Sequence, residues 1–503
     1  MIRRFACAAV VLLAAVLTSA HVGSPDAYFS GRAGPYDIDV VITPPAVVPG
    51  LARIVVHSAD SRITSVNIRP VYWRAGSKGA PVGDDAARVS GQPGTFAGDL
   101  WMMASGSYTI EVTVRGSAGN GAVMVPAAAL ATGQLALSGP LRLLLIVLGT
   151  LLVAGIITAI HVAAGESQVP PGEPVSPEQK RHARRAAAIA VPVLAFIVFG
   201  GAQWWDSEAE RYRQTLYKPI ATRTQLHDSA DVATLDLTVT DPAWRLGITP
   251  IMPDHGKLAH LFIVGQEFPF AFAHLHPSMP DGNTFRTILP PLPPGPYRIF
   301  ADVVHESGFQ RTLVDSVRLP KWLHTTGSEQ LGPDESWSIN DRVFVASYMP
   351  SNPHEGGLYV VWSGGVPTYE KTPGVLRFTL SDIHGNPYLV EPFLGMAGHA
   401  VVVREDGKVF IHLHPNGTAS MASQMAFALR NRGDTTAEGR LKLDDAQSMA
   451  GMMTRPDTVR TLSFPYAFPS AGRYRVYVQV RVRGDVHTTA FDVNVLPTGA
   501  PPH

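Results

Sequence analysis

The chain has 503 residues and no net charge at pH 7, and 16% of its residues are charged. This length is too great for one domain and leaves room for about three. Basic and acidic side chains are equal in number, 41 of each, so no basic field points to nucleic acid. The only cysteine is Cys7, close to the start of the sequence. We therefore expect a processed protein without disulfides.

The first twenty residues have the pattern of a secretory signal peptide. Two arginines precede an apolar run from Ala8 to Leu17, and small residues end the segment at Ala20. Cleavage after Ala20 would leave His21 first, where a free amine and an imidazole form a chelate that Cu(II) favours. Such a site needs another ligand, and His57 is the only other histidine of residues 21–138. The alternative is that His21 is merely a terminal residue.

Two apolar segments follow residues 21–138. Residues 141–164 are long enough to span a bilayer, and residues 186–203 end at a tryptophan pair typical of the membrane interface. The loop between them is basic through Lys180, Arg181, Arg184 and Arg185. Because short basic loops stay cytoplasmic, the sequence predicts a transmembrane helical hairpin over residues 139–205 of a bacterial cytoplasmic membrane protein, with the flanking domains on the extracytoplasmic, periplasmic side. Buried core helices are the alternative.

Three strand-like segments begin with the same Gly-x-Tyr sequence, at Gly106, Gly295 and Gly472. Alternating apolar residues and β-branched side chains predict strands there. The last two units also share an earlier strand, at Leu235–Asp241 and Leu376–Asp382. Short strands between many Gly and Pro turns predict a mainly β fold. We expect three immunoglobulin-like β-sandwich units and a short tail, at residues 21–138, 206–320, 321–497 and 498–503.

The strongest chemical signal is a phrase that occurs twice. Ala-His-Leu-His-Pro at 273–277 and Ile-His-Leu-His-Pro at 411–415 each place two imidazoles on one strand face. Each phrase ends a predicted hairpin whose first strand begins with another histidine, and opposed residues of a hairpin share a face. The sequence thus predicts two separate three-histidine faces as metal sites: His260, His274 and His276, and His399, His412 and His414.

Neighbouring residues extend these two sites. Near the first triplet the sequence also has His255, Asp302 and His305. Near the second, a sulfur ligand could come from Met396 or from a loop that contains Met449, Met452 and Met453. Thioether with imidazole suits Cu(I), and imidazole with carboxylate suits Cu(II) or Zn(II), so copper is the expected metal and zinc the alternative. Methionine is more often core filler, and the histidines could instead stabilise hairpins through bonds to loop carbonyls.

These motifs resemble a known group of domains. His255-Gly-Lys-Leu-Ala-His260 with 273–277, and Gly395-Met-Ala-Gly-His399 with 411–415, are similar to the YtkA-like and FixH-like extracytoplasmic β-sandwich domains. The whole layout resembles an uncharacterised family of bacterial membrane-anchored proteins. The resemblance implies β-sandwiches that accompany heavy-metal and copper handling. Ala259 replaces the methionine expected before the first histidine. A processed N-terminal histidine is also similar to the CopC-type periplasmic copper carriers.

The sequence favours binding over catalysis. Hydrolytic signatures such as Gly-x-Ser-x-Gly and His-Glu-x-x-His are missing, so we expect no enzyme. The leading hypothesis is a membrane-anchored extracytoplasmic protein that binds copper for storage, delivery or resistance. It would exchange the ion with a metal-transport or membrane-complex partner. The alternatives are a non-catalytic scaffold of a membrane complex, in which the histidines are structural, and a copper oxidase that uses His21.

Overall fold

The computed structural model of the chain describes residues 26–443 and 460–499, apart from gaps at 171, 230–231, 247–248, 268–269, 322, 324–330, 341–343, 346–357, 364–367, 383 and 389. It divides into two compact units, one of Met1–Leu130 with Lys218–His503 and one of Ala131–Tyr217. Several predicted features lie outside the described residues: the signal peptide, His21, Met449, Met452 and Met453.

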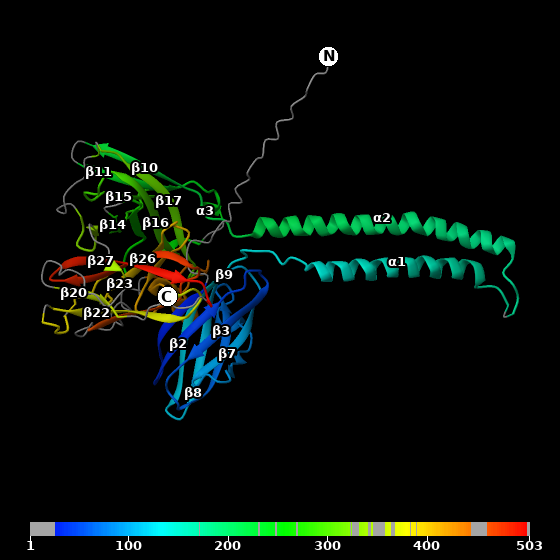
Figure 1. The fold of residues 1–503 in the computed structure, drawn as a ribbon, viewed down its shortest axis with the longest axis horizontal. Coiled ribbons are helices and arrows are strands. Elements are labelled where there is room, and N and C mark those ends of the chain that lie inside the picture. Colours follow the sequence, from blue (N-terminus) through cyan, green and yellow to red (C-terminus); the bar gives the residue numbers. More distant parts are fainter. Residues whose placement is uncertain are drawn as a thin grey trace, which may run out of the picture. The chain divides into compact units, whose positions relative to one another are not determined.

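The larger unit consists mainly of β-strands in three pairs of sheets, which confirms the predicted fold class (Figure 1). In the first sandwich, one sheet has the order β1-β2-β3-β7-β6 and the other β5-β4-β8-β9. Their bounds are β1 Ala27–Ala33, β2 Tyr36–Thr43, β3 Gly50–His57, β4 Ile63–Tyr72, β5 Asp84–Asp85, β6 Ala87–Arg88, β7 Thr95–Met102, β8 Gly106–Gly116 and β9 Gly119–Ala129. A single 3-10 turn, Ser77–Gly79, follows β4. Strand β2 shows why a sandwich forms: Ile38, Val40 and Ile42 are buried and alternate with exposed residues.

The second sandwich pairs the sheet β10-β11-β15 with the sheet β12-β16-β13-β14-β18, and β17 lies beside β16. The bounds are β10 Thr222–Ser229, β11 Val232–Val239, α3 Ala243–Leu246, β12 Ile251–Met252, β13 His260–Gly265, β14 Phe270–Leu275, β15 Thr284–Ile288, β16 Gly295–His305, β17 Gln310–Leu319 and β18 Ser336–Asn340. Strand β18 pairs with β14, with Ser336 opposite His274. This sandwich therefore takes a strand from beyond residue 320, where the sequence analysis ended it.

The third sandwich pairs the sheet β20-β22-β25 with the sheet β19-β27-β26-β23-β24, to which β21 adds through β27. The bounds are β19 Phe344–Val345, β20 Tyr359–Trp362, β21 Thr368–Tyr369, β22 Gly374–Ser381, β23 His399–Arg404, β24 Phe410–Leu413, α4 Met421–Arg432, β25 Thr461–Tyr466, β26 Gly472–Val482 and β27 Asp485–Leu496. Its core gathers aromatic and branched side chains from both sheets, Trp362, Phe378 and Phe491 among them.

Helix α4 was not predicted, although its ends carry ordinary signals. The Ser420 side chain accepts a hydrogen bond from the Ser423 backbone N–H, which caps the start. Gly433 ends the helix in a left-handed conformation, φ 82°, that glycine adopts at little cost. Ala422, Ala426 and Leu429 on one face are buried. Alanine and serine supply three of the five buried residues, so the apolar periodicity in the sequence is weak.

The smaller unit is a helical hairpin of α1 (Gly139–Glu166) and α2 (Pro177–Thr215), seen side by side in Figure 1. Both helices are long and apolar enough to cross a membrane. None of the apolar window of α1 and only 6% of that of α2 is buried, which is unlike a core helix. Helix α2 starts earlier than residue 186 because Ser176 and Gln179 form a capping box, so the predicted basic loop lies largely in its first turns.

Candidate metal centre

The two histidine hairpins occupy equivalent places in the second and third sandwiches, as the sequence predicts. Strand β13 pairs with β14 so that Phe262 lies opposite His274, and β23 pairs with β24 so that Val401 lies opposite His412. Each first strand also pairs with the long Gly-x-Tyr strand of its sandwich, β16 or β26. The duplicated sequence therefore encodes a duplicated three-stranded site.

A tight turn before each hairpin orients the first histidine. The turns share left-handed residues at equivalent positions, His255 (φ 51°) and Leu394 (φ 50°), each followed by a glycine. Each turn brings a backbone carbonyl to the Nε2 atom of the first histidine. Because a carbonyl oxygen can only accept a hydrogen bond, the Nε2–H group must donate it. The distances are 3.3 Å from His260 to Asp254 O and 3.0 Å from His399 to Phe393 O. The lone pair of each ring is thus on Nδ1, an arrangement that orients metal-ligating imidazoles.

Within each triplet the first two rings already converge. His260 Nδ1 lies 3.1 Å from His274 Nε2, and His399 Nδ1 lies 3.0 Å from His412 Nε2. One ligand atom from each member of a triplet falls within 4.8 Å of those of the other two. The first histidine of each triplet uses a nitrogen on a backbone carbonyl, and His414 also interacts with the backbone of Ala419. The rings therefore neither point apart nor are all engaged with the backbone, two arrangements that would oppose metal binding.

The third histidine of the first triplet, His276, is oriented by a carboxylate that is not part of the triplet. The Glu335 carboxylate accepts the His276 backbone N–H at 2.8 Å and lies 3.3 Å from His276 Nδ1. Because the carboxylate accepts, Nδ1 donates and the lone pair is on Nε2. That atom is buried and has no hydrogen-bond partner among the described residues. Glu335 is thus a further residue of the site that the sequence analysis missed.

The two triplets lie side by side, which corrects the prediction of two separate faces. The His412 ring centroid is 5.3 Å from that of His260 and 5.6 Å from that of His274. The reason is an apolar seam between the two sandwiches, formed by Phe262, Val264, Phe272, Phe300, Val401, Val403, Phe410, Tyr477 and Ala490. Strands β13 and β23 are buried on both faces: one face packs in its own sandwich and the other on its twin. Uniformly apolar strands signal such double burial in a sequence.

The two sandwiches make equivalent aromatic contacts with each other across the seam. Phe272 stacks on Tyr477 with ring centroids 4.2 Å apart, and Phe300 stacks on Phe410, also at 4.2 Å. Phe272 and Phe410 each precede the second histidine of a triplet by two residues, so the two contacts are equivalent. Stacked aromatic pairs of this kind contribute about 1 kcal/mol each beyond burial. They fix the distance between the histidine clusters.

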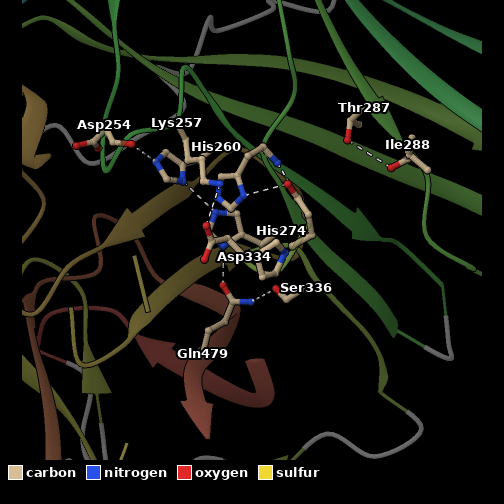
Figure 2. Close-up of polar contacts among 12 residues, drawn as sticks. Asp254, Lys257, His260, His274, Thr287, Ile288, Asp334, Ser336 and Gln479 are labelled. Atoms are coloured by element: carbon tan, nitrogen blue, oxygen red, sulfur yellow. Dashed lines mark hydrogen bonds and ion pairs between the residues drawn. The ribbon is translucent and has the colours of Figure 1, made fainter. Parts of the chain in front are cut away.

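Each sandwich also sends one polar side chain to the other's triplet. Asp302 lies opposite His260 on β16, and Gln479 lies opposite His399 on β26. Across the seam, Gln479 Oε1 is 2.9 Å from His274 Nδ1, and Asp302 Oδ2 is 3.9 Å from His412 Nδ1. Figure 2 shows His260, His274 and Gln479 joined in a row.

The Gln479 amide can turn to donate to His274. Among the described residues, its nitrogen donates to the hydroxyl groups of Ser336 (2.7 Å) and Thr488 (3.1 Å). Hydroxyl groups either donate or accept, so exchanging the amide ends keeps every contact satisfied. This residue therefore adjusts to either tautomer of the ring beside it.

Five histidines of the cluster have pKa values well below the ordinary range of histidine. Burial lowers the pKa of His399 to about 3 and lowers those of His260, His274, His412 and His414 well below the ordinary range. Mutual repulsion of the rings in their charged forms adds to this effect. At neutral pH these imidazoles keep their lone pairs, so an ion would not have to displace protons from charged rings.

Several ring nitrogens of the cluster have no hydrogen-bond partner among the described residues. Both nitrogens of His255 are buried in this way, and so are those of His414 apart from an interaction with the Ala419 backbone. The Ala419 backbone offsets the fall in the His414 pKa only in part. Leaving a buried donor or acceptor unpaired costs about 1–3 kcal/mol. The cluster therefore lacks groups that a bound ligand would supply.

The remaining predicted residues lie nearby or apart. Met396 is half-buried on the turn before β23, at the position that Lys257 occupies in the second sandwich. Lys257 pairs with Asp334 at 2.9 Å. His305 does not join the cluster: its Nδ1 donates to Thr249 O at 2.6 Å and its ring meets the edge of a tryptophan.

The first sandwich supports the second triplet through the loop after His414. The Thr418 backbone N–H donates to Tyr28 O at 3.0 Å, and Ser30 N–H donates to Asn416 O at 2.9 Å. Gly417 (φ 124°) lies so close that a Cβ atom there would be 1.9 Å from Tyr28 O. Only glycine fits this approach, so the edge of β1 anchors the histidine loop.

Comparisons with known proteins name no activity. Residues 354–496, in the third sandwich, match a family described as Domain of unknown function (DUF8832). No curated protein matches the chain. An engineered protein is 19% identical, with a TM-score of 0.15. The match covers 18% of this chain and 19% of the length of the engineered protein. A tetra-tandem repeat from the extending region of a large adhesion protein is 10% identical over 90% of this chain and 72% of its own, with a TM-score of 0.15. The chicken CNTN1 FN1-FN3 domains are 8% identical over 93% and 98%, with a TM-score of 0.13. Likenesses at these scores carry no argument.

Proposed function

We propose that this protein is a membrane-anchored, extracytoplasmic metal-binding protein that holds copper as Cu(I) in its histidine cluster, for storage or delivery. The observation that carries the proposal is the convergence of six imidazoles, three from each sandwich, in one cluster. Each triplet offers the nitrogen ligands that copper accepts, and backbone or carboxylate partners orient the rings.

Charge favours a monovalent ion in the triplets. Burial lowers the pKa of five of their six rings, and it raises the pKa of the Asp302 carboxyl between them to about 7. Two divalent ions roughly 5 Å apart repel by about 13 kcal/mol at an effective dielectric constant of about 20, whereas two monovalent ions repel by about 3 kcal/mol. Imidazole ligands cannot cancel the larger charge. We therefore propose one Cu(I) ion in each triplet.

Burial favours retention of the ion over rapid exchange. His274 and His399 are 0% exposed, and the side chain of His276 is only 3% exposed. An ion in this place would leave only when the seam opens or when a partner inserts its own ligands. Release by ligand exchange with a membrane-bound partner fits a storage or delivery role, and no reaction on a substrate is involved.

The proposed location rests on the basic start of α2. Lys180, Arg181, Arg184 and Arg185 lie between the two apolar windows. Basic residues between membrane spans stay in the cytoplasm, which would put both flanking segments outside. Protease added to intact spheroplasts would then digest the sandwiches, and protection of the sandwiches would contradict this location.

Anaerobic titration of the detergent-solubilised full chain with Cu(I) tests the function. We expect two ions per wild-type chain, and one after either His274→Phe or His412→Phe, because phenylalanine fills the ring's space without a ligand. His227→Gln, which changes a histidine 54% exposed and outside the cluster, is the matched control and should still bind two. Affinity no tighter than micromolar, or equal binding by all variants, would refute copper storage.

A scaffold of a membrane complex is the second candidate. The apolar seam and the bonds from His260 and His399 to backbone carbonyls favour it, because both would stabilise the pair of sandwiches without metal. In that case His412→Phe would change the stability of the chain, and neither the wild type nor the variant would bind copper.

A further inference from the structure

A third group of ligand atoms lies between the two sandwiches. Asp254 and His255 come from the turn before β13, and His414 comes from the end of the second histidine hairpin. Their ligand atoms lie within 4.8 Å of one another. We propose that these three residues form a divalent-cation site that joins the second and third sandwiches. The proposal deepens the proposed function and rests on it only where it says that the site shares His414 with a copper triplet.

His255 is the residue that points to a ligand. Its side chain is 1% exposed, and both ring nitrogens are without a hydrogen bond among the described residues. Its ring centroid is 5.3 Å from that of His414, in the opposite sandwich. It also has a left-handed backbone conformation, φ 51°, which most residues avoid. A buried imidazole without a partner is costly, and such an orphaned polar group calls for an explanation such as a bound ion.

The duplication shows that the fold does not require this histidine. The equivalent turn of the third sandwich has Leu394, with φ 50° and 8% of its surface exposed. An apolar side chain therefore fills the same turn with the same backbone and leaves no polar atom unpaired. The two turns therefore differ at this position: the second sandwich has a histidine where the third has a leucine.

Asp254 supplies the charge that the triplets lack. Its Oδ1 atom accepts the Ala422 backbone N–H at 2.8 Å, at the first turn of α4, and lies 3.9 Å from His255 Nε2. The hydrogen bond holds the carboxylate in place beside the imidazole. A carboxylate with two imidazoles is a ligand set suited to Zn(II) or Cu(II), whereas imidazoles alone leave a divalent charge uncompensated.

His414 belongs to this group and to the second triplet. A neutral imidazole has one lone pair, so it ligates one ion at a time. An ion between Asp254 and His255 and an ion in the second triplet therefore compete for His414. The first triplet has its own three histidines and is independent of this competition.

Zn(II) binding by the full chain in detergent, followed by native mass spectrometry and competition with a chelating dye, tests the site. We expect one Zn(II) in the wild type and an affinity at least tenfold weaker in His255→Leu. That variant copies the residue of the twin turn, so it should fold and still bind two Cu(I). Asp254→Asn keeps an oxygen acceptor for the Ala422 N–H but loses the charge, and it should weaken Zn(II) to the same degree.

Two further measurements address the shared residue. His412→Phe should lose one Cu(I) and keep its Zn(II), and saturating Cu(I) should expel Zn(II) from the wild type. Wild-type Zn(II) affinity in His255→Leu would overturn the site, and Zn(II) retained beside two Cu(I) would overturn the sharing. Failure of the copper proposal is a different result, because it would show as no Cu(I) bound while Zn(II) binding still depends on His255.

Discussion

Acid should destabilise the metal-free chain, and His305 allows one contribution to be measured by itself. Burial lowers its pKa to about 4, whereas a histidine in an unfolded chain titrates at about 6.5. Between these values the unfolded chain binds the extra proton, so the free energy of unfolding falls as the pH falls through this window. The expected loss between pH 7 and pH 5 is about 2 kcal/mol for this residue.

Other groups add to this loss or offset it. His399, with a pKa of about 3, contributes a similar loss of about 2 kcal/mol, and the other histidines with lowered pKa values act in the same direction. Asp302 acts oppositely: burial raises its pKa to about 7, so the folded chain takes up a proton first and gains about 2 kcal/mol over the same range. The histidines outnumber this carboxyl, so the net effect is destabilisation.

Urea unfolding in detergent at pH 7 and pH 5, followed by tryptophan fluorescence, measures the effect. His305→Gln keeps an N–H donor for Thr249 O but does not titrate, so its loss between the two pH values should be smaller than that of the wild type by about 2 kcal/mol. An unfolding free energy that is equal or larger at pH 5, or the same pH dependence in the variant, would contradict the reasoning.

Three further changes test the parts that hold the cluster. Phe410→Ala removes a fully buried ring that stacks on Phe300, so the free energy of unfolding should fall by about 3–5 kcal/mol in urea titrations; a loss below about 1 kcal/mol would mean the seam is not tightly packed. Gln479→Leu leaves His274 Nδ1 without its amide partner, and Cu(I) affinity at one site should fall by about 10–100-fold in chelator competition, with the other site unchanged. Gly417→Ala places a Cβ atom against Tyr28 O, so it should free the first sandwich from the histidine loop and increase amide hydrogen exchange there; unchanged exchange would show that β1 does not anchor the loop.

Much of the candidate site could be predicted from the alternation of side chains along a strand and from hairpin pairing. Because residues two apart share a face, His274 and His276 had to point together, and hairpin pairing then put His260 beside them. The structure bears this out with a contact of 3.1 Å between His260 and His274. These are local consequences of β geometry, and they need no knowledge of how sheets pack.

The close approach of the two triplets could not be predicted from residues near each other in the sequence. It depends on two sheets packing face to face, and residues such as Phe300 and Phe410 meet across more than a hundred positions of sequence. The signal in the sequence was the unbroken run of apolar residues in β13 and β23, because Phe262 and Val401 interrupt the alternation expected of a sheet with one solvent-exposed face. The sequence placed His255 near the first triplet, but the role proposed for it needed the structures of both turns, because it depends on the comparison with Leu394.

The duplication of the sandwich explains why the histidine faces are buried, because each copy covers the apolar face of the other. A single sandwich would expose Phe262, Phe272 and its histidine face to water, and a free apolar face of that kind is an unfavourable surface. A second copy supplies a complementary face, so the two bury one another and exclude solvent from both triplets. Exclusion of water is also what keeps the imidazoles neutral, as the pKa of about 3 at His399 shows. The same packing that stabilises the pair of sandwiches would thus also prepare the nitrogen atoms as ligands of the proposed metal sites. The turn that has His255 in one sandwich and Leu394 in the other is one of the places where the pair departs from a mere structural repeat.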